Sequence, residues 1–410
     1  MLNLVTAGTP SCFAFFVRLR GFVIQTLSAS RRIGGPVKKH LQHAVFLVIV
    51  ACLMICAYGR IEYDQYPYSG WDLAAYRAMA AAAPQLNPIV SSPFAYRLFS
   101  PYLVGLLPYP DPTAFYAATV IASVLLIILL YCFLCEMGLD ATVATVTTLL
   151  FTFNKHLFGF TVWDYFQIND VLTLIFVTGM LWAMIHDRWM LFGLILLLGA
   201  VTREINLVML PVALVYQVEK GWTPSKIKLI MAASAPALVV FALLRLLIDA
   251  PGYSLTQALL AYAPKLLSVE TWFRLLVNPF IPLTLLPLIY LPRTIAFFRN
   301  KKYLLVFLTL VLLSTLFGIN NERLLAPAFV VFYWLIGVIL EQEIAQGKRI
   351  PGLLIVVCAL IASIHHEYSR FDFVTRELSL MLSIGSFVLL SAVAIGSLIA
   401  TRKRAGKLSE

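Results

Sequence analysis

The sequence predicts an all-α membrane protein, a polytopic bundle of about twelve transmembrane helices. Of its 410 residues, 61% are hydrophobic and only 12% are charged, whereas roughly a quarter of the residues in a soluble domain are charged. The apolar residues fall in runs of about 15 to 24, close to the length that a helix needs to cross a bilayer. Because hydrocarbon offers no partner to backbone N–H and C=O groups, these runs are expected to be helical.

Twelve apolar spans follow one another along the chain. Only Thr202–Glu204 separates the fifth span from the sixth, so these two form either a re-entrant pair or one broken helix. The predicted spans cover residues 43–59, 112–135, 140–154, 169–186, 189–202, 204–218, 227–247, 280–297, 303–318, 325–340, 351–366 and 379–400.

The basic residues predict the orientation of the chain. With an even number of spans, both termini lie on one side of the membrane. The termini and the segments after even-numbered spans hold 20 of the 31 Lys and Arg residues, which identifies this side as cytoplasmic. The net charge of +11 is therefore mainly a topology signal, and no nucleic-acid partner is expected.

Three regions are predicted. Residues 1–42 form a cytoplasmic or interfacial arm, in which Phe13–Leu27 suits a helix lying in the membrane interface. Residues 43–400 form the transmembrane domain, and residues 401–410 form a basic cytoplasmic tail. Cys132 and Cys135 lie inside an apolar helix without a companion histidine, so they are interpreted as small packing residues. The sequence has no phosphate-binding loop and no dinucleotide fingerprint.

The longest outer loop, about residues 60–111, is the main candidate for chemistry. Its segment Trp71 to Ala83 is expected to form a short helix that carries Asp72 and Tyr76 on one face. A second short helix is expected to open at Tyr96 and Arg97. Two short helices on the outer membrane surface, with an Asp on one and an Arg on the other, would make a catalytic platform.

Further ionisable residues gather at the outer ends of other spans. Such groups are expensive near membrane depth unless they are paired or face water, so they often mark function; interfacial anchors and structural ion pairs are the alternative interpretations. Adjacent histidines with Glu367 are weak evidence for a metal site. The polar and ionisable residues at the span ends are Lys155, His156, Asp164, Gln167, Asn169 and Asp170, then Arg203 with Glu204, Glu322 with Arg323, and His365 with His366.

The first outer loop and the arginine-bearing segments resemble the GT-C superfamily of membrane glycosyltransferases, in particular uncharacterised bacterial members. The resemblance covers roughly residues 43–340 and rests on G-W-D-L-A-A-Y-R-A-M-A, F-A-Y-R-L-F-S-P-Y-L, T-R-E and N-E-R-L-L-A-P, in this order and on one side of the membrane. Such enzymes use a sugar linked to a polyprenyl phosphate. The chain lacks the adjacent acidic pair of several branches, so a need for a divalent metal stays open, and no other cofactor is expected.

The resemblance implies a bacterial inner-membrane enzyme of the cell envelope that transfers a sugar to an extracytoplasmic glycan, lipid or protein. Asp72 is the best match for the catalytic base, and Asp64 is the second. Guanidinium groups stabilise the departing phosphate best. The expected substrate- and phosphate-binding residues are Arg97, Arg203, Arg323, Lys155, His156, Tyr76 and Asp164.

Three alternatives remain at this point. A secondary transporter or flippase for a lipid-linked or anionic substrate would place its ionisable residues near the bilayer midplane and show related halves. A polysaccharide polymerase or ligase would carry its large outer loop late in the chain. A scaffold without catalytic activity is the third alternative.

Overall fold

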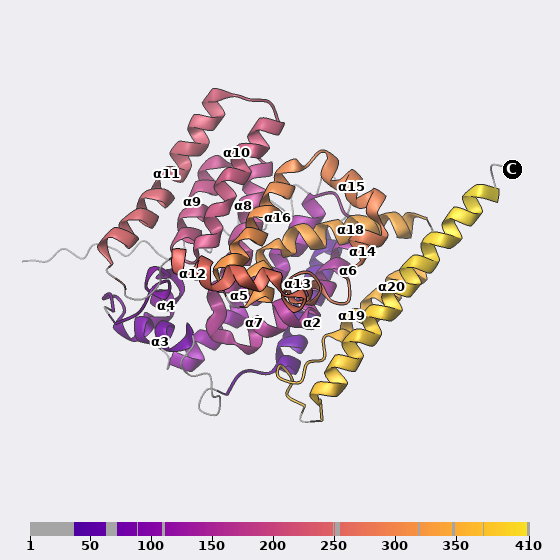
Figure 1. The fold of residues 1–410 in the computed structure, drawn as a ribbon, viewed down its shortest axis with the longest axis horizontal. Coiled ribbons are helices and arrows are strands. Elements are labelled where there is room, and N and C mark those ends of the chain that lie inside the picture. The colour runs from indigo at the N-terminus through magenta and orange to yellow at the C-terminus, as the bar shows by residue number, and fades with distance from the viewer. Residues whose placement is uncertain are drawn as a thin grey trace, which may run out of the picture. The chain divides into compact units, whose positions relative to one another are not determined.

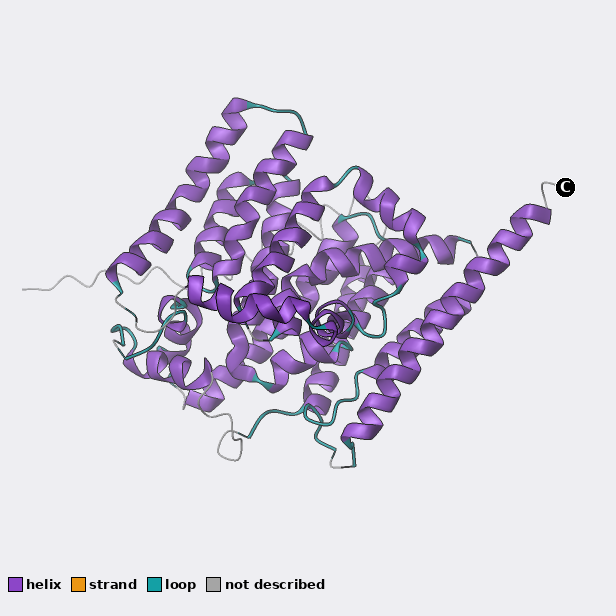
Figure 2. Cartoon of the chain, viewed as in Figure 1, coloured by secondary structure: helices purple, strands orange, loops and turns teal. Residues whose placement is uncertain are grey.

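The fold was taken from a computed structural model, which describes residues 37–62, 72–87, 89–108, 111–248, 250, 255–318, 320–346, 349–371 and 373–407. Within these residues, all regular secondary structure is helical (Figure 2). The predicted all-α fold class is therefore confirmed. The predicted interfacial helix Phe13–Leu27 and the candidate base Asp64 lie outside the described residues.

The helices follow one another along the chain, and Figure 1 labels most of the α-helices among them. They are α2 (Val37–Tyr58), α3 (Asp72–Ala82), η3 (Phe94–Tyr96), α4 (Phe99–Gly105), α5 (Asp111–Glu136), α6 (Ala141–Thr152), η4 (Lys155–Gly159), α7 (Phe160–Trp163), η5 (Tyr165–Gln167), α8 (Ile168–Ile185), α9 (Trp189–Ala200), η6 (Glu204–Val208), α10 (Met209–Glu219), α11 (Pro224–Leu247), α12 (Leu255–Tyr262), η7 (Ala263–Leu267), α13 (Val269–Leu276), η8 (Asn278–Phe280), α14 (Leu286–Ile289), α15 (Leu291–Arg299), α16 (Lys302–Ser314), η9 (Thr315–Phe317), α17 (Asn321–Leu325), η10 (Ala326–Ala328), α18 (Phe329–Ala345), α19 (Arg349–Ala362) and α20 (Arg376–Lys407).

Six helices in the described part of the chain are long and apolar enough to cross a membrane, and each coincides with a predicted span. A seventh is obtained if Leu291–Arg299 and Lys302–Phe317, which meet at 107°, count as one broken span. Three further predicted spans correspond to shorter apolar helices, α6, α9 and Gly352–Ala362. The six long helices are Lys39–Tyr58, Pro112–Glu136, Tyr165–Ile185, Pro224–Leu247, Glu322–Ala345 and Arg376–Ile399.

Two predicted spans are interrupted. Residues 280–297 contain Pro282, Pro287 and Pro292 and form the short helices α14 and α15 instead of one continuous helix, because each proline removes a backbone donor and crowds the preceding turn. The predicted span 204–218 begins with the 3₁₀ turn η6 before α10. The break between α9 and η6 places Arg203 and Glu204 between two apolar helices.

Large apolar side chains remain exposed along the long helices. In α20, for example, Leu380, Met381 and Val388 are each more than half exposed, and Leu246 and Leu247 of α11 are still more exposed. Water-soluble proteins seldom present apolar surface on this scale. Together with the lengths of the helices, this exposure indicates a protein of the membrane.

The chain divides into two compact units, residues 1–46 and 47–410. The described residues of the first unit belong to the beginning of α2. In the second unit, α8, α9 and α11 pack in sequence, α5 lies against α8, and α19 lies along α20 (Figure 1). This bundle holds the ends of α8, η6 and α17, which carry the charged residues described below.

The contact between α9 and α11 depends on a glycine and gives a first prediction. A Cβ atom on Gly193 would lie 2.1 Å from the backbone oxygen of Ala233, whereas a Cβ on Gly385 of α20 would meet nothing within 4 Å. Gly193→Ala should destabilise the protein by about 1–3 kcal/mol through overpacking. Gly385→Ala should stabilise it by about 0.5–1 kcal/mol through helix propensity. Unfolding midpoints in detergent check both values, and equal midpoints would contradict close packing at Gly193.

Candidate functional site

The centre of the candidate site is Asp170, a carboxylate in the first turn of α8. Its side chain is 4% exposed. It accepts hydrogen bonds from Arg203 Nη1 on one oxygen and from Arg323 Nε on the other. The two arginines come from the break before η6 and from α17. One buried carboxylate therefore holds two guanidinium groups from distant parts of the sequence, an arrangement that needs full pairing to be tolerated.

The short segments that carry the two arginines are fixed by polar side chains. Asn206 Nδ2 donates to the backbone oxygens of Gly199 and Arg203, at 3.2 and 3.0 Å. Asn320 caps α17 by accepting from the backbone N–H of Arg323 at 3.1 Å. These bonds satisfy the backbone groups that a broken helix leaves open, so the arginines project from defined positions.

Arg323 also links the long loop between α2 and α5 to this centre. Its Nη2 donates to Asp72 Oδ2 at 2.6 Å, and Asp72 is the first residue of α3. Burial works to raise the pKa of Asp72, but the positive charges of Arg323 and Arg97 outweigh burial and lower it to about 2. Asp72 is thus a firmly ionised partner for Arg323.

A second arginine of the loop, Arg97, pairs with other groups. It donates to Glu204 Oε2 at 3.2 and 3.3 Å and to the hydroxyl of Tyr76 at 3.2 Å. The other oxygen of Glu204 accepts from Arg245 Nη2 of α11 at 3.4 Å. Adjacent Arg203 and Glu204 therefore reach in different directions and connect the Asp170 centre with the loop.

Asp164 is a further carboxylate in this region, at the turn between α7 and η5. It is 6% exposed. Burial raises its pKa to about 7, opposed by Arg323 and reinforced by Asp72 and Asp170. The Gln167 amide acts to lower the pKa of both Asp164 and Asp72. We call Asp72, Asp164, Asp170, Arg203 and Arg323, with Arg97 and Glu204, the charged cluster.

A scan of protein-family models and searches of curated proteins and of solved structures found no match to this chain.

Lys155 and His156 lie in a different group of side chains. Lys155 is buried and donates to Ser383 Oγ of α20, and burial lowers its pKa to about 8. The His156 ring lies edge-on to the His365 ring, with 6.0 Å between their centroids. Burial and the charge of Lys155 lower the His156 pKa to about 3, so His156 is neutral near pH 7. These residues do not hydrogen-bond any arginine of the charged cluster among the described contacts.

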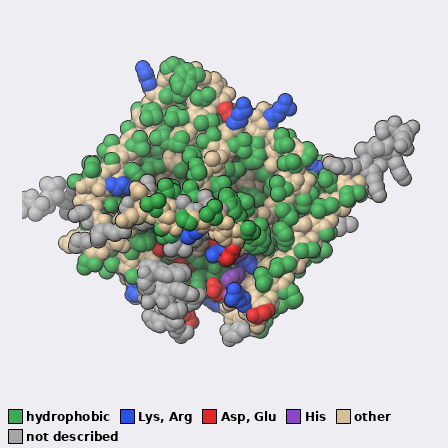
Figure 3. Space-filling view, in the orientation of Figure 1, with side chains coloured by type: hydrophobic (Ala, Val, Ile, Leu, Met, Phe, Trp, Pro, Cys, Tyr) green, Lys and Arg blue, Asp and Glu red, His purple; other side chains and the backbone are tan. Residues whose placement is uncertain are grey.

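Charged and histidine side chains gather in the lower part of the face in Figure 3, whereas hydrophobic side chains cover most of the rest. The described residues contain no group of three or more His, Cys, Asp or Glu side chains placed to hold a metal ion. The arginines of the charged cluster can bind anions, and its carboxylates can accept protons.

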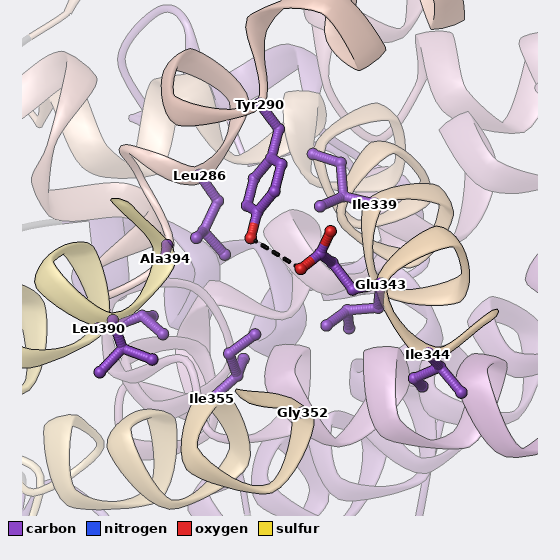
Figure 4. Close-up of a pocket in the computed structure, with 11 residues that line it drawn as sticks. Leu286, Tyr290, Ile339, Glu343, Ile344, Gly352, Ile355, Leu390 and Ala394 are labelled. Carbon is purple, nitrogen blue, oxygen red and sulfur yellow. Dashed lines mark hydrogen bonds between the residues drawn. The ribbon is translucent and has the colours of Figure 1, made fainter. Parts of the chain in front are cut away.

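A pocket away from the charged cluster lies between α14, α18, α19 and α20 (Figure 4). Its walls are apolar except for Glu343, which Tyr290 approaches with its hydroxyl group, at 3.2 Å. Arg293 also pairs with Glu343, at 2.7 Å. Glu343 follows Arg323 by 20 residues along one long helix, which places the two roughly 30 Å apart. The pocket is thus separate from the charged cluster.

The structure brings together most, but not all, of the residues predicted from sequence. Asp72, Arg203 and Arg323 meet around Asp170, and Asp164 lies beside them. Tyr76 is fully buried and holds Arg97. The central role of Asp170 and the involvement of Arg245 were not anticipated. The sequence did offer one signal for Asp170, because this aspartate is the second residue of the predicted span 169–186.

Proposed function

We propose that this protein is a GT-C-like glycosyltransferase that moves a sugar from a polyprenyl-phosphate donor to an extracytoplasmic acceptor. The observation that carries the proposal is the charged cluster, in which Arg323 joins the loop residue Asp72 to the buried pair of Asp170 and Arg203. The proposed setting is the bacterial inner membrane, with about twelve spans, both termini in the cytoplasm and the first-loop helices at the outer surface.

The arginines of the cluster offer donors that suit an anionic ligand. Arg97, Arg203 and Arg323, together with Arg245, face the carboxylates of Asp72, Asp170 and Glu204, and Asp164 changes its charge near neutral pH. Arg203 Nη2 and Arg323 Nη1 have no hydrogen-bond partner among the described residues. Guanidinium donors of this kind suit the oxygens of a phosphate.

The same geometry suits the proposed reaction. Negative charge grows on the phosphate as the glycosidic bond to it breaks, and fixed arginines stabilise this charge without reorganising. An acidic side chain must take the proton of the acceptor hydroxyl. Both kinds of group lie within one cluster, and the apolar surface of the long helices would leave the lipid tail of the donor in the bilayer.

The proposal predicts transfer by the purified protein in nanodiscs. Labelled polyprenyl-phosphate hexoses and pentoses, offered with a membrane glycolipid extract, should yield labelled product. Arg97→Ala should lower the rate at least about tenfold, since it frees Tyr76 and leaves Glu204 with Arg245 alone. Exposed Arg299 provides the matched control, Arg299→Ala, which should leave the rate unchanged. Absence of transfer from every donor would contradict the proposal.

One observation favours a transporter or flippase for an anionic lipid as the second candidate. Arg203 and Glu204 lie at a break between two apolar helices, and interrupted helices with charged residues line the sites of many transporters. Uptake or lipid-scrambling by liposomes that contain the protein, without any transfer product, would support this candidate instead.

A further inference from the structure

The charged cluster contains two carboxylates that differ in their suitability for accepting a proton. Asp72 is tied to Arg323 Nη2 at 2.6 Å, and a carboxylate in such a charge-assisted bond holds a proton poorly. Asp164 is nearly fully buried and takes part in none of the ion pairs found among the described residues. The side chain of Gln167 acts to lower the pKa of both.

The position of Asp164 is fixed by its backbone. Its N–H donates to the backbone oxygen of Phe160 at 2.8 Å, and its own backbone oxygen accepts from Gln167 N–H at 2.9 Å. Gln167 is 2% exposed, and its Oε1 has no hydrogen-bond partner among the described residues.

Resting on the proposed function, we propose that Asp164 accepts the proton of the acceptor hydroxyl and that Asp72 is a positioning residue that holds Arg323. The acceptor oxygen forms a bond to the anomeric carbon while the bond from this carbon to the donor phosphate oxygen breaks. The electron pair of that bond stays on the phosphate, which leaves as polyprenyl phosphate. The proton moves to a carboxylate oxygen of Asp164.

The surroundings of Asp164 also suit this task. The charged groups that face it are Arg323 from α17, Asp72 from α3 and Asp170 from α8. The negative neighbours and the burial favour proton uptake, and Arg323 opposes it. The resulting pKa of about 7 matches a base that works near neutral pH, whereas the pKa of about 2 at Asp72 does not.

The pH dependence of the wild-type rate separates the two carboxylates. If Asp164 is the base, it must be deprotonated, so kcat/KM should rise about tenfold per pH unit up to a pH near 7 and then level off. If Asp72 were the base, the rate would stay level down to a pH far below 5. A level profile between pH 5 and 8 in a protein that transfers sugar would overturn the inference and leave the proposed function intact.

Variants give a second, independent test. Asp164→Asn should lower kcat by about 10²- to 10⁴-fold, and Asp164→Glu should restore part of it. Asp72→Asn should raise the donor KM more than it lowers kcat. It should also move the acid limb to lower pH without removing it, because the negative charge of Asp72 helps raise the pKa of Asp164. Asp164→Asn with a kcat within tenfold of the wild type would refute the role of Asp164. If this variant fails to fold, the wild-type pH profile decides; if the wild type transfers nothing, the proposed function itself fails.

Discussion

Replacing Arg323 with alanine should lower sugar transfer by about 10²- to 10³-fold, the loss seen when one preorganised donor to a developing negative charge is removed. Arg323 contacts Asp72 at 2.6 Å and also donates to Asp170. It is one of the residues that join the loop before α5 to the helix bundle. Its loss removes a positive charge from the proposed phosphate site and leaves two carboxylates facing each other. Initial rates with a labelled polyprenyl-phosphate donor measure the effect.

Arg323→Lys separates charge from geometry. Lysine keeps the positive charge but presents a single ammonium group, which cannot reproduce the planar contacts that guanidinium makes through Nε and Nη2. We expect a rate between those of the wild type and Arg323→Ala. Arg188, an exposed arginine at the start of α9, provides the control Arg188→Ala. Wild-type transfer by Arg323→Ala would remove Arg323 from the mechanism.

The long helices could be predicted from sequence because hydropathy alone determines them. A run such as Pro112–Glu136 has high mean hydropathy over a length that fits the bilayer, and no alternative fold satisfies its backbone in lipid. The segment 280–297 is also apolar enough to suggest a span, but its three prolines act on local backbone hydrogen bonds that a hydropathy average ignores. Hydropathy therefore predicted where the apolar segments lie better than where the helices within them begin and end.

The partners within the charged cluster could not be predicted in the same way. Asp72 and Arg323 lie 251 positions apart in sequence, and nothing local to either indicates the other. The adjacent pair Glu322 and Arg323 resembled an ion pair, yet Glu322 binds Arg274 and Asn278 whereas Arg323 reaches Asp72. The packing of the whole bundle decides which helix ends come together. This packing depends on many apolar residues, none of which is specific by itself.

Lys155 and His156 illustrate a related difficulty. Their place at the outer end of a span suggested that they join the arginines, but Lys155 turns to Ser383 of α20 and His156 turns to His365. The sequence grouped these side chains with the arginines because all of them lie at the ends of predicted spans. The sequence did not indicate which side of the helix bundle Lys155 and His156 face.

Asp170→Asn should destabilise the folded protein by about 3–5 kcal/mol, the range found when one partner of a buried ion pair is removed. The side chains of Asp170 and Arg203 are 4% and 7% exposed, so solvent screens their charges little. Asparagine keeps an acceptor oxygen but loses the charge that holds Arg203 and Arg323. Arg203 is affected more, because Arg323 retains Asp72 as a second carboxylate. Unfolding of the purified protein by denaturant in detergent measures the loss.

A comparison with Asp187→Asn tests whether burial causes the effect. Asp187 pairs with Lys220 and Lys226 at 3.7 and 3.4 Å, but its side chain is 39% exposed, and solvated pairs contribute only about 0–1 kcal/mol. Asparagine also tolerates the positive φ of 55° at this position. The double variant Asp170→Asn/Arg203→Met should recover part of the lost stability, since it removes the buried charge left without a partner. Equal losses of stability in Asp170→Asn and Asp187→Asn would show that Asp170 is not the electrostatic centre of the cluster. The same would follow if the double variant lost as much free energy of unfolding as the two single variants together.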